Sequence, residues 1–196
     1  MTTTIKPRER ILEVADELFY GRGLHVVGID EIVARAGTAK ATLYAHFPSK
    51  DALIATYLSR RSEDWRRYMN EQLAQRGGTP AEQIHAVFEI LAESCATPGF
   101  RGCPFINATA EYPDPDHPGR VVADAHRTWV RDLLAGLSEK AGVADPDGLA
   151  GQLVLLYDAA MVGAQFNPGG TAPESAREAA RSLVDAALSS SRTDRD

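Results

Sequence analysis

The spacing of its prolines constrains the fold of this chain more than any other feature of its sequence. No proline occurs between Pro7 and Pro48 or between Pro48 and Pro80, so a helix can run uninterrupted through either interval. The later prolines separate segments in which apolar residues recur every three or four positions, and no alternating strand pattern of useful length occurs. The sequence therefore predicts an all-α fold with about nine helices.

Glycines, prolines and capping residues predict where these helices begin and end. We expect helices over residues 8–20, 29–36, 39–46, 49–75, 105–110, 147–166 and 173–189, with one more opening at 79–80 and another through 121–137. Thr79-Pro80-Ala81-Glu82 has the spacing of a capping box with proline at the first helical position. Asp116 is expected to cap the helix that runs through 121–137.

Charge is distributed unequally along the chain. Residues 1–51 contain seven Lys or Arg and seven Asp or Glu, whereas the remainder contains 14 and 20, which accounts for the whole net charge of −6. A neutral N-terminal segment on an acidic body permits nucleic-acid binding only if its basic side chains gather on one face.

The two cysteines, Cys95 and Cys103, do not form a Cys-x-x-Cys pair, and the N-terminus lacks an apolar leader. No stretch reaches about 18 uninterrupted apolar residues, so no membrane span is expected. The sequence therefore predicts a cytoplasmic protein with reduced thiols, without a membrane partner.

Residues 29–50 contain two short helical segments joined by a tight turn at Ala36-Gly37-Thr38. Gly37 can adopt the left-handed conformation that reverses the chain, and the hydroxyl of Thr38 is expected to cap the second helix. This arrangement predicts a helix-turn-helix, in which the second helix enters the major groove of double-stranded DNA by its N-terminal end.

The second helix of this pair has side chains suited to DNA. The small residues Ala39 and Ala41 let the backbone approach base edges, and Lys40 can reach guanine acceptors or phosphate. Donors on later residues suit phosphate oxygens, and a lysine at the start of the next helix can hold a phosphate together with the helix amides. The predicted DNA-contacting residues are Thr38, Ala39, Lys40, Ala41, Thr42, Tyr44, His46 and Lys50. Leu43 and Phe47 are expected to face the core.

The string AGTAKATLYAHFPSK, residues 36–50, resembles the recognition region of TetR/AcrR-type regulators, whose most recognisable pattern is Thr-Leu-Tyr-x-His-Phe-x-x-Lys. The similarity covers roughly residues 8–60. It implies a DNA-binding domain over 1–52, a ligand-binding and dimerisation domain over 53–190, and a polar tail over 191–196. It also implies that Tyr44 and Lys50 clamp phosphate. Ala39 and Gly28 depart from the family pattern, which commonly has capping Ser or Thr there.

The resemblance further implies a ligand cavity among the middle helices. Aromatic residues and methionine recur there at helical spacing, and although most such residues form core, some should line the cavity. The predicted ligand-binding residues are Trp65, Phe88, Phe105, Asn107, Trp129, Tyr157 and Met161. The expected function is a repressor that an apolar or planar small molecule releases from its operator. An activator and a ligand-independent repressor are the alternatives.

The segment 147–166 is too apolar for the surface of a monomer, because apolar residues occupy both of its sides. Together with the Ala-rich face of 173–189 it predicts a four-helix bundle across a two-fold axis of a homodimer. The predicted interface residues are Leu153, Tyr157, Ala180, Leu183, Val184 and Ala187.

Cys103 precedes Pro104, the expected first residue of a short helix, where the helix dipole favours a thiolate. A redox or electrophile sensor is therefore an alternative function, and a buried structural thiol is the other interpretation of this residue. The sequence contains no nucleophile–base arrangement, paired-carboxylate motif or phosphate-binding loop, so we expect neither enzyme activity nor a metal or cofactor.

Overall fold

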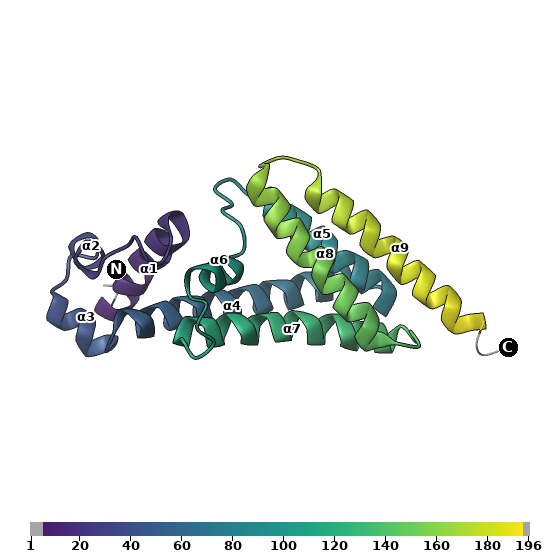
Figure 1. Cartoon of the computed structure of the whole chain (residues 1–196), viewed down its shortest axis with the longest axis horizontal. Helices are drawn as coiled ribbons and strands as arrows, with labels where there is room; N and C mark the ends of the chain where they lie inside the picture. Colours follow the sequence, from purple (N-terminus) through teal and green to yellow (C-terminus); the bar gives the residue numbers. More distant parts are fainter. Residues whose placement is uncertain (1–5, 194–196) are drawn as a thin grey trace. The chain divides into compact units, whose positions relative to one another are not determined.

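The computed structural model describes residues 6–193, and within this range the chain is helical without strands (Figure 1). The helices are α1 (Pro7–Arg22), α2 (Ile29–Arg35), α3 (Lys40–His46), α4 (Lys50–Arg76), α5 (Pro80–Cys95), α6 (Pro104–Glu111), α7 (Pro118–Lys140), α8 (Pro146–Phe166) and α9 (Ala172–Thr193). The prediction of an all-α fold is confirmed, and most helix bounds lie within two residues of the expected ones.

Local sequence rules explain two of the helix ends. Gly37 has φ +58°, and the amide of Thr38 donates to the carbonyl of Val33 at 3.0 Å, which closes α2 with a Schellman turn. At α5, Thr79 Oγ1 accepts from the amide of Glu82 at 3.3 Å, and the Glu82 carboxylate accepts from the amide of Thr79 at 2.7 Å. The predicted turn and capping box are both confirmed.

Two predicted caps are wrong. Ala39, whose methyl group cannot accept a hydrogen bond, occupies the N-cap of α3, since Thr38 lies one residue too early and its amide closes the preceding turn. At α7 the amide of Gly119 donates to Nδ1 of His117 at 3.1 Å. His117 therefore occupies the capping position expected for Asp116.

The C-terminal helix is longer than expected, because α9 continues to Thr193. Ser191 is buried, and its hydroxyl accepts from the amide of Ala144 at 2.9 Å. This bond ties the last turns of α9 to the loop before α8, so the predicted polar tail is helical as far as 193. Residues 194–196 lie outside the described residues.

The chain divides into two compact units. The first, here the head unit, contains the residues up to Asp64 together with Pro104–His126, and the second, the body unit, contains Trp65–Cys103 together with the residues from Arg127 onward. The domain boundary predicted after residue 52 falls inside α4, which begins in the head unit and ends in the body unit. Helix α6 and the start of α7 belong to the head unit.

In the head unit, α1, α2 and α3 gather around the start of α4 (Figure 1). Helix α1 buries one apolar face, and the fully buried Ile32 and Leu43 anchor α2 and α3 to the same core. The guanidinium of Arg61 in α4 makes two 2.8 Å hydrogen bonds to Asp16 of α1. This fork-shaped pair fixes the angle between α1 and α4 more precisely than apolar packing alone.

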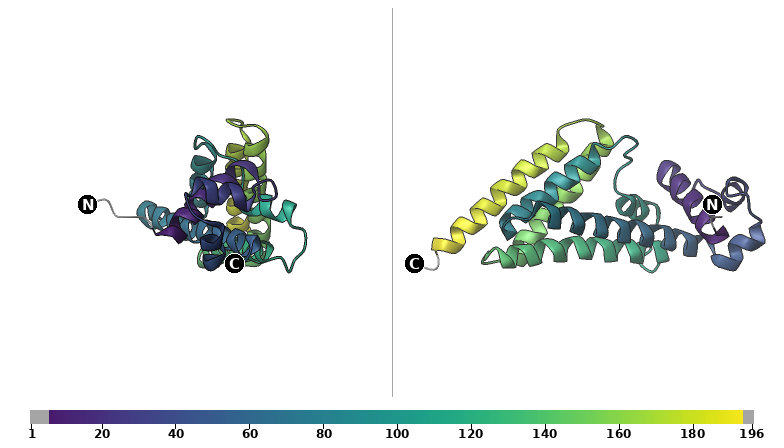
Figure 2. Two further views of the ribbon diagram at one scale, coloured as in Figure 1. Left: turned by 90° about the vertical axis from the view of Figure 1, so that its left-hand side faces the viewer. Right: turned by 180° about the vertical axis from the view of Figure 1, so that it is seen from behind.

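In the body unit, α8 packs beside α9 and α5 (Figures 1 and 2). Eight of its side chains are buried. Of the described helices, only α8 is long and apolar enough to cross a membrane, with a mean hydropathy of 1.3. A core helix passes the same test, and the burial of α8 against its neighbours is that of a core helix.

Candidate nucleic-acid interface

Helix α3 presents one apolar face to the head unit and one mixed face to solvent. Leu43 is fully buried and Phe47 is 2% exposed, so these two side chains hold the helix against the core. Of the predicted DNA-contacting residues, Ala39, Lys40, Ala41, Tyr44 and His46 are exposed, whereas Thr38, Thr42 and Lys50 are half-buried. The exposed face therefore combines small residues with hydroxyl, imidazole and ammonium groups.

Lys40 is engaged by an acidic residue that the sequence analysis did not single out. Its Nζ lies 2.8 Å from Oδ1 of Asp30, at the start of α2. The hydrogen bond to Asp30 raises the pKa of Lys40, so the ammonium stays charged at neutral pH. Any phosphate or base that binds Lys40 must compete with this carboxylate.

Lys50 points back to the loop between α1 and α2. Its Nζ donates to the carbonyl of His25 at 3.3 Å, and partial burial lowers the pKa of Lys50. We expected Lys50 and the first amides of α4 to hold a phosphate together. One of those amides, that of Ala52, already donates to Oγ of Ser49 at 3.0 Å. Fewer donors are therefore available to a phosphate at this helix start than we expected.

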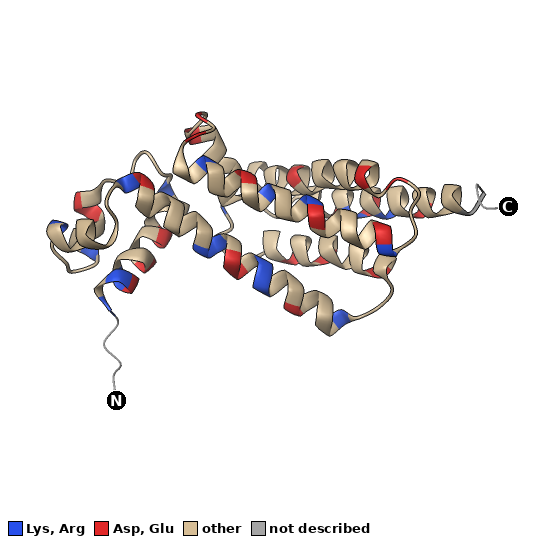
Figure 3. Cartoon of the chain, turned by 90° about the horizontal axis from the view of Figure 1, so that it is seen from below, with Lys and Arg blue, Asp and Glu red and all other residues tan. Residues whose placement is uncertain are grey.

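Other basic residues of the head unit are also paired with acids. Arg35 lies 2.7 Å from Glu17, and Arg22 contacts Glu31. Figure 3 shows basic and acidic residues interleaved along these helices. Local pairs thus offset several cations of the head unit, and sequence-independent attraction to DNA depends on a small number of cations.

The predicted ligand-binding residues are divided between the two units. Phe105 and Asn107 belong to the head unit, where the ring of Phe105 stacks on that of buried His126 with 3.7 Å between centroids. His126 Nδ1 lies 2.9 Å from the hydroxyl of Ser62. Phe105 is buried and Asn107 is half-buried. Phe105, His126 and Ser62 therefore form a small aromatic and polar cluster in the head unit.

The other five predicted ligand-binding residues lie in the body unit. Phe88, Tyr157 and Met161 are buried, whereas Trp65 and Trp129 are half-buried. Burial raises the pKa of Tyr157 well above its ordinary value, and Cys103 adds to this effect. A side-chain hydrogen bond with Trp65 acts in the opposite direction and lowers the pKa of Tyr157.

A groove of about 370 Å³ in the body unit lies away from the predicted ligand-binding residues. It is lined by Arg76, Gly77, Gly78, Glu82, His85, Ala86, Glu89 and Arg181. Arg76 already binds Glu93 at 2.7 Å and Glu89 at 3.1 Å, so acidic neighbours balance the guanidinium. The groove is polar, open and close to neutral, unlike the apolar cavity that the sequence led us to expect.

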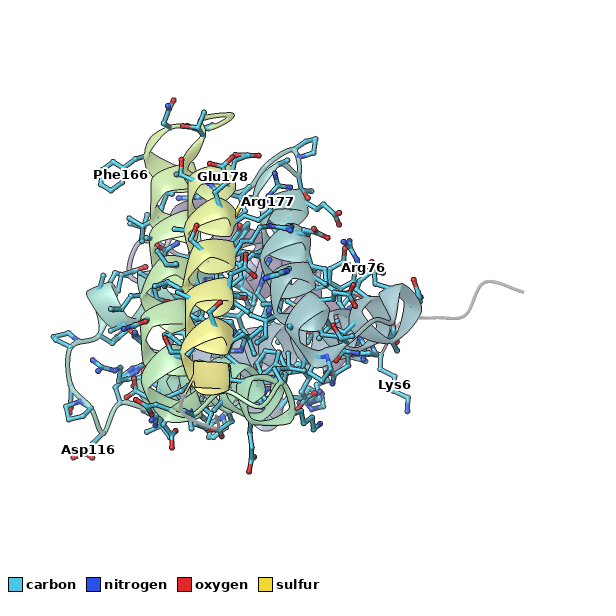
Figure 4. The ribbon with its side chains drawn as sticks, turned by 90° about the vertical axis from the view of Figure 1, so that its right-hand side faces the viewer. Lys6, Arg76, Asp116, Phe166, Arg177 and Glu178 are labelled. Atoms are coloured by element: carbon cyan, nitrogen blue, oxygen red, sulfur yellow. The ribbon has the colours of Figure 1, made fainter. Side chains whose placement is uncertain are left out.

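Most residues predicted for the dimer interface lie in the protomer's own core. Leu153, Ala180 and Val184 are fully buried, Tyr157 is 5% exposed, and Leu183 and Ala187 are half-buried. The opposite face of α8 is the exposed one, with Leu155 at 65% and Phe166 at 87%. Phe166 projects away from the neighbouring helices (Figure 4). The exposed face of α8 is therefore a different face from the one predicted for the interface, and both faces of this helix are apolar.

Of the two thiols, that of Cys103 is buried and that of Cys95 is half-buried. Cys103 is 8% exposed, and Sγ of Cys95 lies 3.7 Å from Sδ of Met161. Burial raises the pKa of Cys95 to about 11, which keeps this thiol protonated at neutral pH. Nothing in this arrangement favours the redox-sensor alternative over a structural role.

Comparison with known proteins places these features in a family. Residues 11–57 match the sequence profile described as bacterial regulatory proteins, tetR family. The chain is 36% identical to SCO4454, a TetR-family transcriptional regulator from Streptomyces coelicolor, with a TM-score of 0.82 over 94% of this chain and 95% of that one.

Two further relatives agree with this match. A tetR-type transcriptional regulator from Streptomyces avermitilis is 32% identical, with a TM-score of 0.79 over 93% of this chain and 98% of that one. The HTH-type transcriptional regulator YjdC of Escherichia coli is 28% identical over 154 residues, which is 77% of this chain and 79% of YjdC. The chain belongs to the TetR family of helix-turn-helix transcriptional regulators.

Proposed function

We propose that this regulator binds operator DNA as a homodimer, represses transcription there, and leaves the DNA when a small apolar or planar molecule binds its body unit. The observation that carries the proposal is the solvent-exposed face of α3, which presents Lys40, Tyr44 and His46 opposite the buried Leu43. In this account Lys40 reaches base edges or phosphate, and Tyr44 and Lys50 bind phosphate.

The exposed face of α8 supports the homodimer. Leu155, Ala159, Val162 and Phe166 follow one another at helical spacing, and this uncharged stripe is exposed or half-buried in the protomer. A two-fold axis lets one copy cover the same stripe of the other. The dimer then carries two copies of α3, which read half-sites about 34–36 Å apart or a multiple of that distance.

The environment of Trp65 supports a ligand in the body unit. The buried indole N–H of Trp65 lies beside the hydroxyl of Tyr157, and a carbonyl or ether oxygen of a bound molecule can accept a hydrogen bond from either group. Met161 and Tyr157 are buried beside apolar neighbours and suit an apolar ring. Such a ligand releases the repressor only if it binds the DNA-free state more tightly than the DNA-bound state.

Tryptophan fluorescence tests the release. Both tryptophans of the chain, Trp65 and Trp129, are among the predicted ligand-binding residues, so a bound planar aromatic compound should quench their emission. We expect a hit from a panel of such compounds to bind less tightly in the presence of operator, and operator to bind less tightly by the same factor with the ligand. Equal ligand affinity with and without operator would contradict release by ligand.

Asp30→Asn should tighten binding to random-sequence DNA about three- to fivefold at low salt, because it frees Lys40 from its carboxylate. The slope of log affinity against log salt should steepen by about one unit, as expected for one more phosphate contact. Fluorescence anisotropy measures both quantities. Glu71→Gln, which removes an exposed acid from α4 in the body unit, is the matched control. An Asp30→Asn protein that behaves like this control would show that Asp30 does not restrain Lys40.

A further inference from the structure

The last residue of α6, Glu111, binds the loop between α1 and α2 through its side chain and its backbone. Oε1 accepts from the amide of Leu24 at 2.9 Å, and Oε2 accepts from the amide of His25 at 2.7 Å. The carbonyl of Glu111 lies 2.8 Å from Nε2 of His25. Two consecutive amides that converge on one carboxylate form an anion-binding nest, so Glu111 fixes the conformation of this loop.

Gly23 makes room for this carboxylate. It has φ +97°, a conformation that L side chains rarely adopt, and a Cβ built there would lie 3.2 Å from Oε1 of Glu111. The glycine thus turns the chain out of α1 so that the next two amides point at the same anion. The loop and the carboxylate fit each other closely.

The same loop holds Lys50. The carbonyl of His25 accepts from Nζ of Lys50 at 3.3 Å, while the amide of the same residue donates to Glu111. His25 therefore sits between the α6 carboxylate and the α4 ammonium. If Glu111 were displaced, the loop would lose its two amide hydrogen bonds to the carboxylate. The carbonyl of His25, which accepts from Lys50, would then no longer be held in place.

Three neighbouring rings pack beside the contact between Glu111 and the α1–α2 loop. The ring of Tyr112 lies 4.4 Å from that of His25 and 3.8 Å from that of His117, measured between centroids. Nδ1 of His117 accepts the amide hydrogen of Gly119, and its Nε2 lies 3.5 Å from Oδ1 of Asp51. The end of α6 is thus joined to the loop, to the start of α7 and to the start of α4, all within the head unit.

We propose that Glu111 is a positioning residue for DNA binding: it holds the α1–α2 loop and, through the carbonyl of His25, places Lys50 for its phosphate. Glu111 does not itself contact DNA. This inference rests on the proposed role of Lys50, and it adds that a residue 61 positions further along the chain, on another helix, controls that role. The head unit binds DNA most tightly while the carboxylate occupies the amide nest.

Two substitutions test the proposal on the full-length protein. Glu111→Ala removes both acceptors, and Glu111→Gln keeps one oxygen but places an NH₂ group against an amide donor. We expect operator affinity to fall about tenfold or more in Glu111→Ala and less in Glu111→Gln, as for lost hydrogen bonds to a charged group. The salt slope should decrease by about one unit in Glu111→Ala, because the Lys50 contact is lost. Glu178→Gln, on the exposed surface of α9, is the control.

Three readouts separate positioning from general stability. In the DNA-free protein, the amides of Leu24 and His25 should exchange with solvent faster in Glu111→Ala than in wild type, while buried amides of α8 stay protected. Lys50→Ala should weaken wild-type binding but add little to Glu111→Ala, because both remove the same contact. Additive effects of the two substitutions, or wild-type affinity in Glu111→Ala, would overturn the proposal. A Lys50→Ala protein with wild-type affinity would instead refute the proposed role of Lys50.

Discussion

Leu155→Glu should convert the dimer into monomers and reduce operator affinity about 100-fold or more. Leu155 is the first residue of the uncharged stripe of α8 and is 65% exposed in the protomer, so the substitution leaves the protomer's own core intact. In a two-fold interface it buries two carboxylates without partners. Monomers bind half-sites singly and lose the gain in affinity that comes from linking two binding events.

Light scattering at micromolar concentration and anisotropy with operator DNA measure the two effects. Val121→Glu is the matched control, since Val121 is 54% exposed on α7 and lies in the head unit. It should remain dimeric. A dimeric Leu155→Glu protein would place the interface elsewhere. Val184→Glu is not an equivalent test because Val184 is fully buried, and a charge there destabilises the protomer itself.

Lys40→Ala and Tyr44→Phe should each weaken operator binding, but in different ways. A lost base contact costs about 1–3 kcal/mol, so Lys40→Ala should reduce affinity about five- to 150-fold and relax sequence preference. Tyr44→Phe removes a hydroxyl expected on phosphate, so it should weaken all sequences about equally. Both side chains are exposed on α3, and their removal should leave the unfolding temperature within a few degrees of wild type.

Binding-site selection from a random DNA library measures the preference of each variant, and anisotropy measures its affinity. Arg131→Ala removes an exposed cation that pairs with Asp147 in the body unit, and it should bind operator like wild type. If both α3 variants fold and bind the operator with wild-type affinity, α3 is not the recognition helix.

Short-range features of the fold could be predicted from the sequence because they depend on a few neighbouring residues. The turn at Gly37 and the capping box between Thr79 and Glu82 each lie within five positions of the chain. The cap of α7 was missed because Asp and Asn are common caps and histidine is not. The length of α9 was missed because Ser191 is held by Ala144, a contact between residues 47 positions apart.

The exposed face of α3 could be predicted because the positions of Leu43 and Phe47 fix which side is buried. The exposed face of α8 could not be predicted in this way. Leu153 and Leu155 are equivalent in composition, and only the packing of α5 and α9 decides that the first is buried and the second exposed. The contacts of Lys40 and Lys50 could not be predicted either, because their partners Asp30 and His25 lie on other elements. The contact between Glu111 and His25 joins residues that are 86 positions apart in the sequence.

We infer that this TetR-family chain recognises DNA through its head unit. The most direct test is a titration of a duplex of about 30 base pairs, containing either a selected operator or random sequence, at two salt concentrations. We expect affinity to fall steeply as salt rises, and the operator to bind at least about 10³-fold more tightly than random sequence. Equal affinity for the two duplexes, or binding that does not change with salt, would contradict it.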